Sequence, residues 1–321
     1  MKRRKLGRTG LEISELGFGA WAIGGSAYGS TNDRESIAAL EYAFDHGINF
    51  FDTADIYGNG HSEELIGKVF RKSSRRPGVY IASKVGWDFY HGGTKQNFAP
   101  DYIRFACGES LKRLKTDYLD LYQLHNPTLE QIETGKIFDV LDQLKKEGKT
   151  RYYGVSIHLS REGAAAVRGG RPDAIQAIYN LLDQRVKSEL MPLAAEHEIG
   201  LIAREPLYCG LLTGKYNAES EFAKNDHRKR WAREKYLADL KKIERMKSAF
   251  DECKVPLKQA AIEFVLAESA VSVVIPGMKT PAHVSDHLRT VDSPKLSPEE
   301  IRRIQTLYQE EELFQMGFFR N

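Results

Sequence analysis

The sequence predicts an α/β fold, a (β/α)8 TIM barrel preceded by an N-terminal β-hairpin. From residue 16 onward, short β-rich apolar runs alternate with amphipathic segments, and eight such runs can be recognised. None of them leads into the G-x-G-x-x-G turn of a doubly wound dinucleotide-binding fold. The length of 321 residues suits one barrel, so we expect a single domain over residues 1–321.

The β-rich runs and the amphipathic segments between them define the expected elements. The predicted strands are Leu16–Trp21, Asn49–Thr53, Val79–Val85, Leu119–Leu124, Tyr152–Ser156, Ala174–Tyr179, Gly200–Arg204 and Val271–Ile275. The clearest helical periodicities cover residues 33–46, 62–72, 100–114, 134–147, 186–197 and 257–266. Asn32 is a good N-cap for the first helix, and Ser62 for the second.

Two segments lie outside the βα repeat. Residues 3–15 form two short alternating runs around a glycine turn, which predicts a hairpin that plugs the N-terminal face of the barrel. Residues 216–256, after the seventh strand, form an insertion with an expected charged helix over 233–250. Long loops at this face of a barrel form lids or binding segments.

Composition excludes several classes of function. The net charge is +3 and the basic runs are scattered, which argues against nucleic acid as a partner. No run approaches the ~18 apolar residues of a membrane-spanning helix, and the first ten residues contain no apolar stretch. Cys107, Cys209 and Cys253 are isolated, as expected of free thiols in a reducing cytoplasm. We expect a cytoplasmic protein without a bound metal.

Polar side chains stand at the ends of three consecutive predicted strands. Asp52 ends the second strand, Lys84 the third and His125 the fourth, while Tyr57 follows in the loop after Asp52. The carboxyl ends of barrel strands meet at one rim, so we expect these four side chains to converge.

Together the four side chains suit the reduction of a carbonyl group. This reaction needs a proton donor, and a tyrosine with a pKa of about 10 is a poor one unless a cation stabilises its phenolate. Lys84 supplies that cation, Asp52 keeps the buried lysine charged, and His125 orients the carbonyl oxygen. Each residue alone has an ordinary structural alternative: a cap, a half-buried aromatic, a surface lysine or a core histidine.

These residues sit within a series of motifs that resembles the aldo-keto reductases over nearly the whole chain. The similarity is greatest to the bacterial branch near the potassium-channel β subunits and inositol-operon reductases. The motifs are Asp52-Thr-Ala-Asp-Ile-Tyr57-Gly, Ser62-Glu-Glu-Leu-Ile-Gly67, Ser83-Lys84, Leu124-His125, Gly154-Val-Ser156, Tyr179-Asn180, Pro206-Leu, Gly210-Leu-Leu-Thr-Gly-Lys215-Tyr and Ile275-Pro-Gly277.

The resemblance implies an NADPH-binding reductase of aldehydes, ketones or sugar-like carbonyls, with Tyr57 as general acid. Its catalytic residues would be Asp52, Tyr57, Lys84 and His125. Ser156 and Gln176 would hold the nicotinamide carboxamide. The other expected cofactor contacts are Ala20, Trp21, Asp52, Arg204, Glu205, Pro206, Leu207, Cys209, Gly210, Leu211, Lys215, Gly277, Lys279, Thr280, His283, Asp286 and His287. Lys279 would favour NADP(H) by pairing with the 2′-phosphate.

Four positions depart from the family pattern. Ile157 stands where an asparagine often grips the carboxamide, and His287 where an asparagine reads adenine. Arg204 replaces an aromatic that stacks on the nicotinamide, with Glu205 beside it as a possible ion-pair partner or cofactor contact. These changes bear on cofactor affinity and on the preference for NADPH over NADH.

The expected substrate contacts are aromatic residues at the rim together with the catalytic pair. Trp21, Trp87, Tyr57 and His125 are the principal ones, and Phe89, Tyr90 and Trp231 are further candidates. The expected partner is a small-molecule carbonyl or alcohol, and an oligomer is compatible with the sequence. The alternative function is that of an NADP(H)-sensing regulatory subunit with minor turnover.

Overall fold

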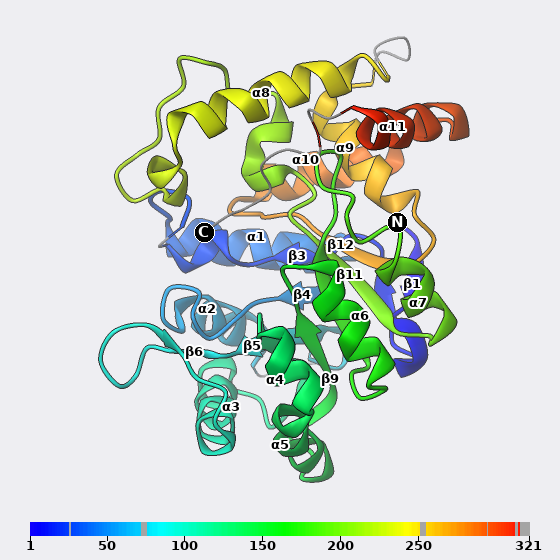
Figure 1. Ribbon diagram of the computed structural model, residues 1–321. Helices are drawn as coiled ribbons and strands as arrows, with labels where there is room; N and C mark the ends of the chain where they lie inside the picture. The colour runs from blue at the N-terminus through cyan, green and yellow to red at the C-terminus, as the bar shows by residue number, and fades with distance from the viewer. Residues whose placement is uncertain (26, 72–75, 251–254, 294, 312–313, 315–321) are drawn as a thin grey trace.

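The computed structural model describes residues 1–25, 27–71, 76–250, 255–293, 295–311 and 314 (Figure 1). Its centre is a sheet of eight parallel strands in the order β12-β11-β10-β9-β8-β5-β4-β3. The strands are β3 (Phe18–Gly19), β4 (Phe50–Asp52), β5 (Tyr80–Val85), β8 (Leu119–His125), β9 (Thr150–Ser156), β10 (Ala174–Ile178), β11 (Gly200–Arg204) and β12 (Val271–Ile275). Parallel bridges from Leu16 to Val274 and from Gly19 to Gly277 close the barrel, which confirms the predicted fold class.

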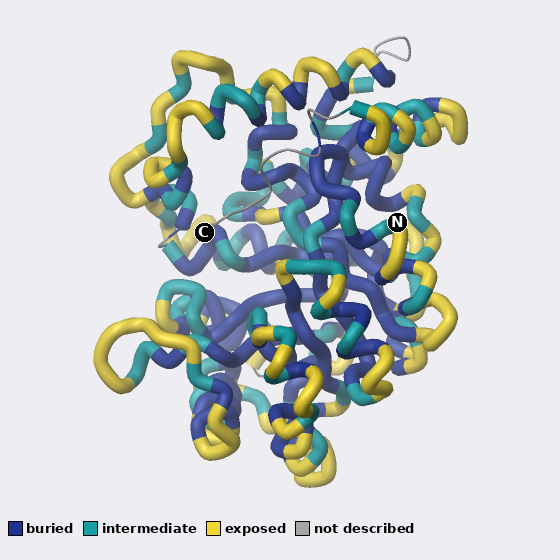
Figure 2. Tube along the Cα trace, viewed as in Figure 1, coloured by how far each residue is buried: buried dark blue, intermediate teal, exposed yellow. Residues whose placement is uncertain are grey.

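Helices surround the barrel and bury their apolar faces against it. They are α1 (Asp33–Asp45), α2 (His61–Phe70), α3 (Pro100–Leu114), α4 (Leu129–Thr134), α5 (Lys136–Lys146), α6 (Ser160–Arg168), α7 (Leu190–Glu196), α8 (Arg233–Lys247), α9 (Leu257–Leu266), α10 (Pro281–Asp292) and α11 (Pro298–Glu310). Figure 2 shows the buried strands at the centre and the exposed surface on the outer helices. None of the helices described is long and apolar enough to cross a membrane.

One of the two predicted helix caps is present in the structure. Asn32 caps α1, since its Oδ1 accepts hydrogen bonds from the amides of Arg34 and Glu35 at 2.9 and 3.2 Å. Ser62 is not the cap of α2, because the helix begins one residue earlier, after Gly60. The buried Ser62 hydroxyl instead donates to the Ala20 carbonyl at 3.0 Å and hydrogen-bonds the Thr53 hydroxyl at 2.8 Å. Ser62 therefore ties together the loops that follow β3 and β4.

The N-terminal hairpin is present and closes one end of the barrel. Strands β1 (Arg3–Lys5) and β2 (Glu12–Ser14) pair antiparallel. Leu6, Leu11 and Ile13 are buried against inward-facing barrel residues such as Leu121 and Ile202. The turn, η1 (Gly7–Thr9), approaches the loop before β11 so closely that a Cβ on Gly7 would lie 2.3 Å from the Glu198 carbonyl oxygen.

Two short 3-10 helices and the predicted charged helix lie between β11 and β12. The first, η4 (Tyr208–Thr213), precedes the insertion of residues 216–256, which contains η5 (His227–Arg230) and α8; α8 ends at Lys247 rather than at residue 250. Tyr236, Ile243 and Met246 are buried on one face of α8. In Figure 1, α8 lies along the edge of the molecule and the chain before it reaches back toward the loop that precedes α1.

Candidate active site

The structure brings Asp52, Tyr57, Lys84 and His125 together at the C-terminal end of the strands. Lys84 Nζ donates hydrogen bonds to Asp52 Oδ1 at 2.5 Å, to the Thr53 carbonyl at 2.8 Å and to the Tyr57 hydroxyl at 3.2 Å. The Tyr57 and His125 rings meet edge to face, with centroids 6.0 Å apart. The cluster therefore contains a phenol, a cation, an anion and an imidazole, with Lys84 joining Asp52 to Tyr57 and Tyr57 packed against His125.

Burial and charge act in opposite directions on the lysine and the phenol. Burial alone lowers the pKa of Lys84, but Asp52 and Tyr57 outweigh it, so the pKa lies above its ordinary value. Burial raises the pKa of Tyr57, and the nearby Lys84 charge offsets part of that rise. At neutral pH the cluster holds an ammonium and a protonated phenol.

His125 is held in its neutral form. Burial lowers its pKa well below the ordinary value, and the charges of Lys84, Arg204 and His158 lower it further. A neutral imidazole keeps one N–H donor and one acceptor, so it can hydrogen-bond a carbonyl oxygen without carrying charge.

Two glutamine side chains hold the second oxygen of Asp52. Gln176 Nε2 donates to Asp52 Oδ2 at 2.7 Å, and Gln123 Nε2 donates to the same atom at 3.2 Å. Gln176 Nε2 also donates to Gln123 Oε1 at 3.3 Å. The amide nitrogen of Gln176 thus faces Asp52, and its Oε1 accepts no hydrogen bond within the part of the chain described.

A single cavity of about 1190 Å³ extends from this cluster along the rim. The expected site residues that line it are Ala20, Trp21, Asp52, Tyr57, Trp87, His125, Gln176, Arg204, Glu205, Pro206, Leu207, Cys209, Gly210, Lys215, Trp231, Gly277, Lys279, His283, Asp286 and His287. Lys84, Ser156, Leu211 and Thr280 lie outside its lining. Thr280 caps α10, where its Oγ1 accepts from the His283 amide at 3.3 Å.

The end of the cavity remote from Tyr57 is rich in cations. Lys279 Nζ donates to the carbonyls of Tyr28 at 2.9 Å and Ser30 at 3.5 Å. Neither Lys279 nor Lys215 forms an ion pair with any carboxylate among the described residues, whereas Lys258 pairs with Asp286. Burial, followed by the charges of Lys215, Lys279 and Lys258, lowers the pKa of His283. This end has unneutralised positive charge and suits an anion.

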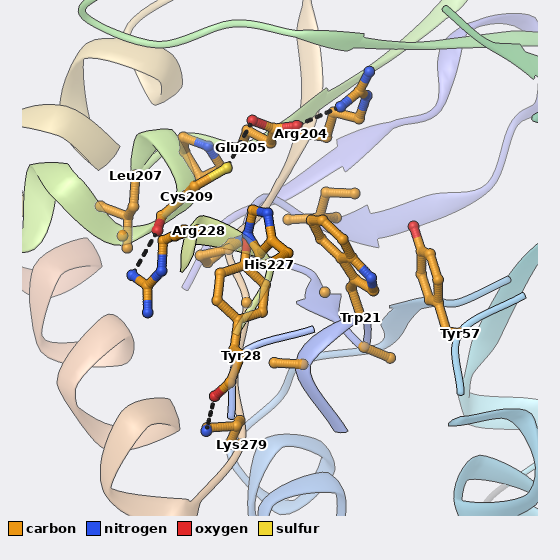
Figure 3. A pocket seen from close by; sticks show the side chains of 18 of the residues that line it. Trp21, Tyr28, Tyr57, Arg204, Glu205, Leu207, Cys209, His227, Arg228 and Lys279 are labelled. Carbon is orange, nitrogen blue, oxygen red and sulfur yellow. Dashed lines mark hydrogen bonds and ion pairs between the residues drawn. The ribbon is translucent and has the colours of Figure 1, made fainter. Parts of the chain in front are cut away.

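Two chain segments meet at the cavity. The insertion was expected to form a lid or binding segment, but its pairing with residues 27–28 was not predicted from the sequence. We call residues 27–28 and 226–228 the cavity cover. Tyr28 forms an antiparallel bridge with Asp226, and the His227 amide donates to the Ala27 carbonyl at 2.9 Å. Figure 3 shows the Tyr28 and His227 rings on one side of Trp21 and the Tyr57 ring on the other.

An ion pair stabilises the cover from within. Arg228 donates to both oxygens of Asp226 at 2.9 and 2.7 Å and to the Cys209 carbonyl at 3.0 Å. Its guanidinium also lies over the ring of Tyr28, 5.2 Å from the centroid. No local sequence signal marks the contact between Arg228 and Tyr28, because it joins loops that are far apart in the chain.

Arg204 and Glu205, which differ from the family pattern, form an ion pair at the cavity wall. Arg204 Nη1 donates to Glu205 Oε1 at 2.6 Å, and Nη2 donates to the Ile157 carbonyl at 3.1 Å. Cys209 Sγ donates to Glu205 Oε2 at 3.3 Å. Cys107 and Cys209 are free thiols, while Cys253 lies outside the described residues.

The aromatic candidates divide into two groups. Trp21, Trp87 and Trp231 line the cavity. Phe89 and Tyr90 do not line it, so the structure lends no support to their expected role as substrate contacts. Tyr90 is drawn away because its hydroxyl accepts a hydrogen bond from Arg113 at 2.6 Å and its ring packs on Phe105.

Comparison with known proteins agrees with the fold. A model of the aldo/keto reductase family matches residues 15–309. The chain is 33% identical to the uncharacterized oxidoreductase YqkF of Bacillus subtilis, over 95% of this chain and 96% of that protein. It is 31% identical to a probable voltage-gated potassium channel subunit beta of Arabidopsis thaliana, over 96% and 97% respectively.

Solved structures give the same result. The holo form of the aldo-keto reductase AKR11C1 from Bacillus halodurans matches with a TM-score of 0.81 at 31% identity, covering 96% of each chain. The chain therefore belongs to the aldo/keto reductase family, a family of NAD(P)H-dependent oxidoreductases that act on small-molecule carbonyls.

Proposed function

We propose that this protein is an NADPH-dependent reductase that converts an aldehyde, ketone or sugar-like carbonyl reversibly to an alcohol, with Tyr57 as general acid. The observation that carries the proposal is the Tyr57 hydroxyl, which lines the cavity and accepts a hydrogen bond from the buried Lys84 ammonium at 3.2 Å. The free thiols of Cys107 and Cys209 support a reducing, cytoplasmic location.

The cavity suits a nicotinamide dinucleotide in size and charge. Its volume of about 1190 Å³ exceeds the range of about 300–1,000 Å³ typical of sites for drug-sized ligands. The ammonium groups of Lys215 and Lys279, which form no ion pair with a carboxylate among the described residues, mark the end that would take the phosphates. The cofactor would supply a hydride to the carbonyl carbon.

The residues of the chain supply the proton and orient the oxygen. Tyr57 gives its hydroxyl proton to the carbonyl oxygen, and Lys84 stabilises the phenolate left behind. Asp52 keeps Lys84 charged through the bond of 2.5 Å. His125 remains neutral and donates a hydrogen bond to the same substrate oxygen.

The aromatic wall supports a broad class of carbonyl substrate. Trp21, Trp87 and Trp231 line the cavity, and such surfaces bind both aromatic aldehydes and the apolar faces of sugars. The alternative is a cofactor-sensing subunit, in line with the name of the Arabidopsis relative. The presence of all four catalytic candidates in one cluster favours turnover over sensing.

A substrate panel separates the two functions. The protein is incubated with NADPH and, in turn, methylglyoxal, 4-nitrobenzaldehyde and keto-sugars, and both NADPH consumption and alcohol formation are measured. We expect at least one carbonyl to be reduced with one NADPH consumed per alcohol formed. Tight NADPH binding without reduction of any member would favour the sensing function instead.

A further inference from the structure

Position 157 has no polar side chain to bind the carboxamide of the nicotinamide. The following inference rests on the proposed function. A carboxamide has an acceptor oxygen and a donor NH₂ group, and both need partners when they are buried. Ile157 stands where the family pattern has an asparagine. The expected contacts are then Ser156 and Gln176 alone, and a polar side chain next to them can complete the set.

The side chain of Ile157 cannot take part, because it points into the core. It is fully buried, and its Cδ1 would lie 2.7 Å from a Cβ placed on Gly163 in α6. The Leu190 side chain of α7 lies equally close to this Cβ position. Ile157 therefore packs in the layer between the barrel and its helices.

Asn126 lies next to the expected carboxamide site and lines the cavity. It follows His125 at the end of β8, and its backbone amide donates to the Ser156 carbonyl at 2.9 Å. Its side-chain Oδ1 accepts a hydrogen bond from Ser156 Oγ at 3.4 Å. Its Nδ2 donates no hydrogen bond within the described residues.

Strand register places the other partners beside it. His125 on β8 pairs with Ser156 on β9, and Ser156 pairs with Gln176 on β10. Paired residues of neighbouring strands point to the same face, so these side chains form one row. Gln176 uses its Nε2 on Asp52 and Gln123, which leaves Oε1 as its acceptor.

We propose that Asn126 binds the carboxamide oxygen of the nicotinamide cofactor through its Nδ2 and so replaces the asparagine absent at position 157. Gln176 Oε1 accepts from the carboxamide NH₂ group at the same time. The two amides match the donor and acceptor of the carboxamide and fix which face of the nicotinamide ring is turned toward Tyr57.

A purely conformational role for Asn126 is the competing explanation. The residue has φ of 60°, in the left-handed region that asparagine and glycine adopt most readily. Asn126→Gly separates the two, because it keeps this backbone conformation and removes the amide. Asn126→Asp is the matched second variant, since it keeps the shape of the side chain and removes the donor.

The test is cofactor binding without substrate, measured by titration calorimetry with NADPH and with 2′,5′-ADP, which has no nicotinamide. A buried hydrogen bond between neutral groups corresponds to a loss of about threefold to tenfold in affinity. We expect both variants to bind NADPH more weakly by about that factor and to bind 2′,5′-ADP like the unmodified protein.

Two results would overturn the assignment: Asn126→Gly binding NADPH as tightly as the unmodified protein, or an equal loss of affinity for both ligands. Because the titration needs no turnover, it is independent of the proposed reaction. An unmodified protein that binds NADPH but reduces no carbonyl would end the proposed function and leave the role of Asn126 standing.

Discussion

At the scale of single residues, we propose that Lys279 favours NADPH over NADH. Its ammonium makes hydrogen bonds only to backbone carbonyls among the described residues, so its charge is not neutralised by a carboxylate. A 2′-phosphate would form a charge-assisted hydrogen bond with it, and such bonds contribute about 1.5–3 kcal/mol.

Lys279→Ala is expected to weaken NADPH binding by about 10-fold to 100-fold and NADH binding by less than about threefold. The dissociation constants of both cofactors are measured by fluorescence titration. Lys224→Ala, at an exposed position in the insertion, is the control and should change neither. Equal weakening of NADPH and NADH by Lys279→Ala would remove this residue from the phosphate site.

His287 links stability to pH. Burial, with Lys258 nearby, lowers its pKa from 6.5 to about 3 in the folded protein. Between these values the unfolded chain binds one proton more at this residue than the folded chain, so acidification favours unfolding. The free energy of unfolding should fall by up to about 1.4 kcal/mol per pH unit from this residue.

We expect His287→Asn to reduce this acid sensitivity without a comparable change above pH 7. Urea unfolding of the cofactor-free protein at pH 7, 6, 5 and 4 measures the slope for each protein. Parallel slopes for His287→Asn and the unmodified chain would show that His287 does not titrate in this way.

At the scale of elements, the cavity cover joins the loop after β3 to the segment around η5. Its contacts are backbone hydrogen bonds between residues 27–28 and 226–228 and the buried pair of Arg228 with Asp226. Tyr28, His227 and Arg228 of the cover line the cavity, so we expect a cofactor bound there to be held in part by these contacts. The dissociation rate of the cofactor should therefore depend on the Arg228 pair.

Arg228→Ala is expected to raise the NADPH dissociation rate by about tenfold, with a smaller effect on association. Stopped-flow displacement measures both rates. The chain contains a matched control in Arg185, which binds Asp183 through the same two-residue spacing but does not line the cavity. If Arg185→Ala and Arg228→Ala had the same effect, the cover would not control release.

Sequence patterns predicted the strands and helices more accurately than the loops that connect them. All eight barrel strands were located, since each is an apolar run followed by a helical period, and the residues at strand ends followed from them. Ser62 was misassigned because a serine before two glutamates also suits a cap, while here its hydroxyl bridges two loops. Tyr90 and the cover depend on contacts between distant segments, which local patterns do not encode.

At the scale of the whole molecule, the two ends of the barrel have different tasks. The hairpin of β1 and β2 buries Leu6, Leu11 and Ile13 at one end and contributes to stability. The other end holds the cavity, where polar groups such as Lys84 and Asp52 are buried at an energetic cost. Substitutions in the cavity can therefore alter chemistry while the hairpin and core maintain the fold.

Tyr57 is the proposed proton donor, and the Tyr57→Phe variant is the sharpest test of this role. The variant removes only the hydroxyl that accepts a hydrogen bond from Lys84 at 3.2 Å. General acid catalysis by a positioned side chain raises the reaction rate by about 10²–10⁴-fold. With a carbonyl that the unmodified protein reduces, the single-turnover rate should fall by that factor, while the NADPH dissociation constant stays within about threefold. A Tyr57→Phe rate within tenfold of the unmodified protein, with NADPH bound equally well, would contradict the account.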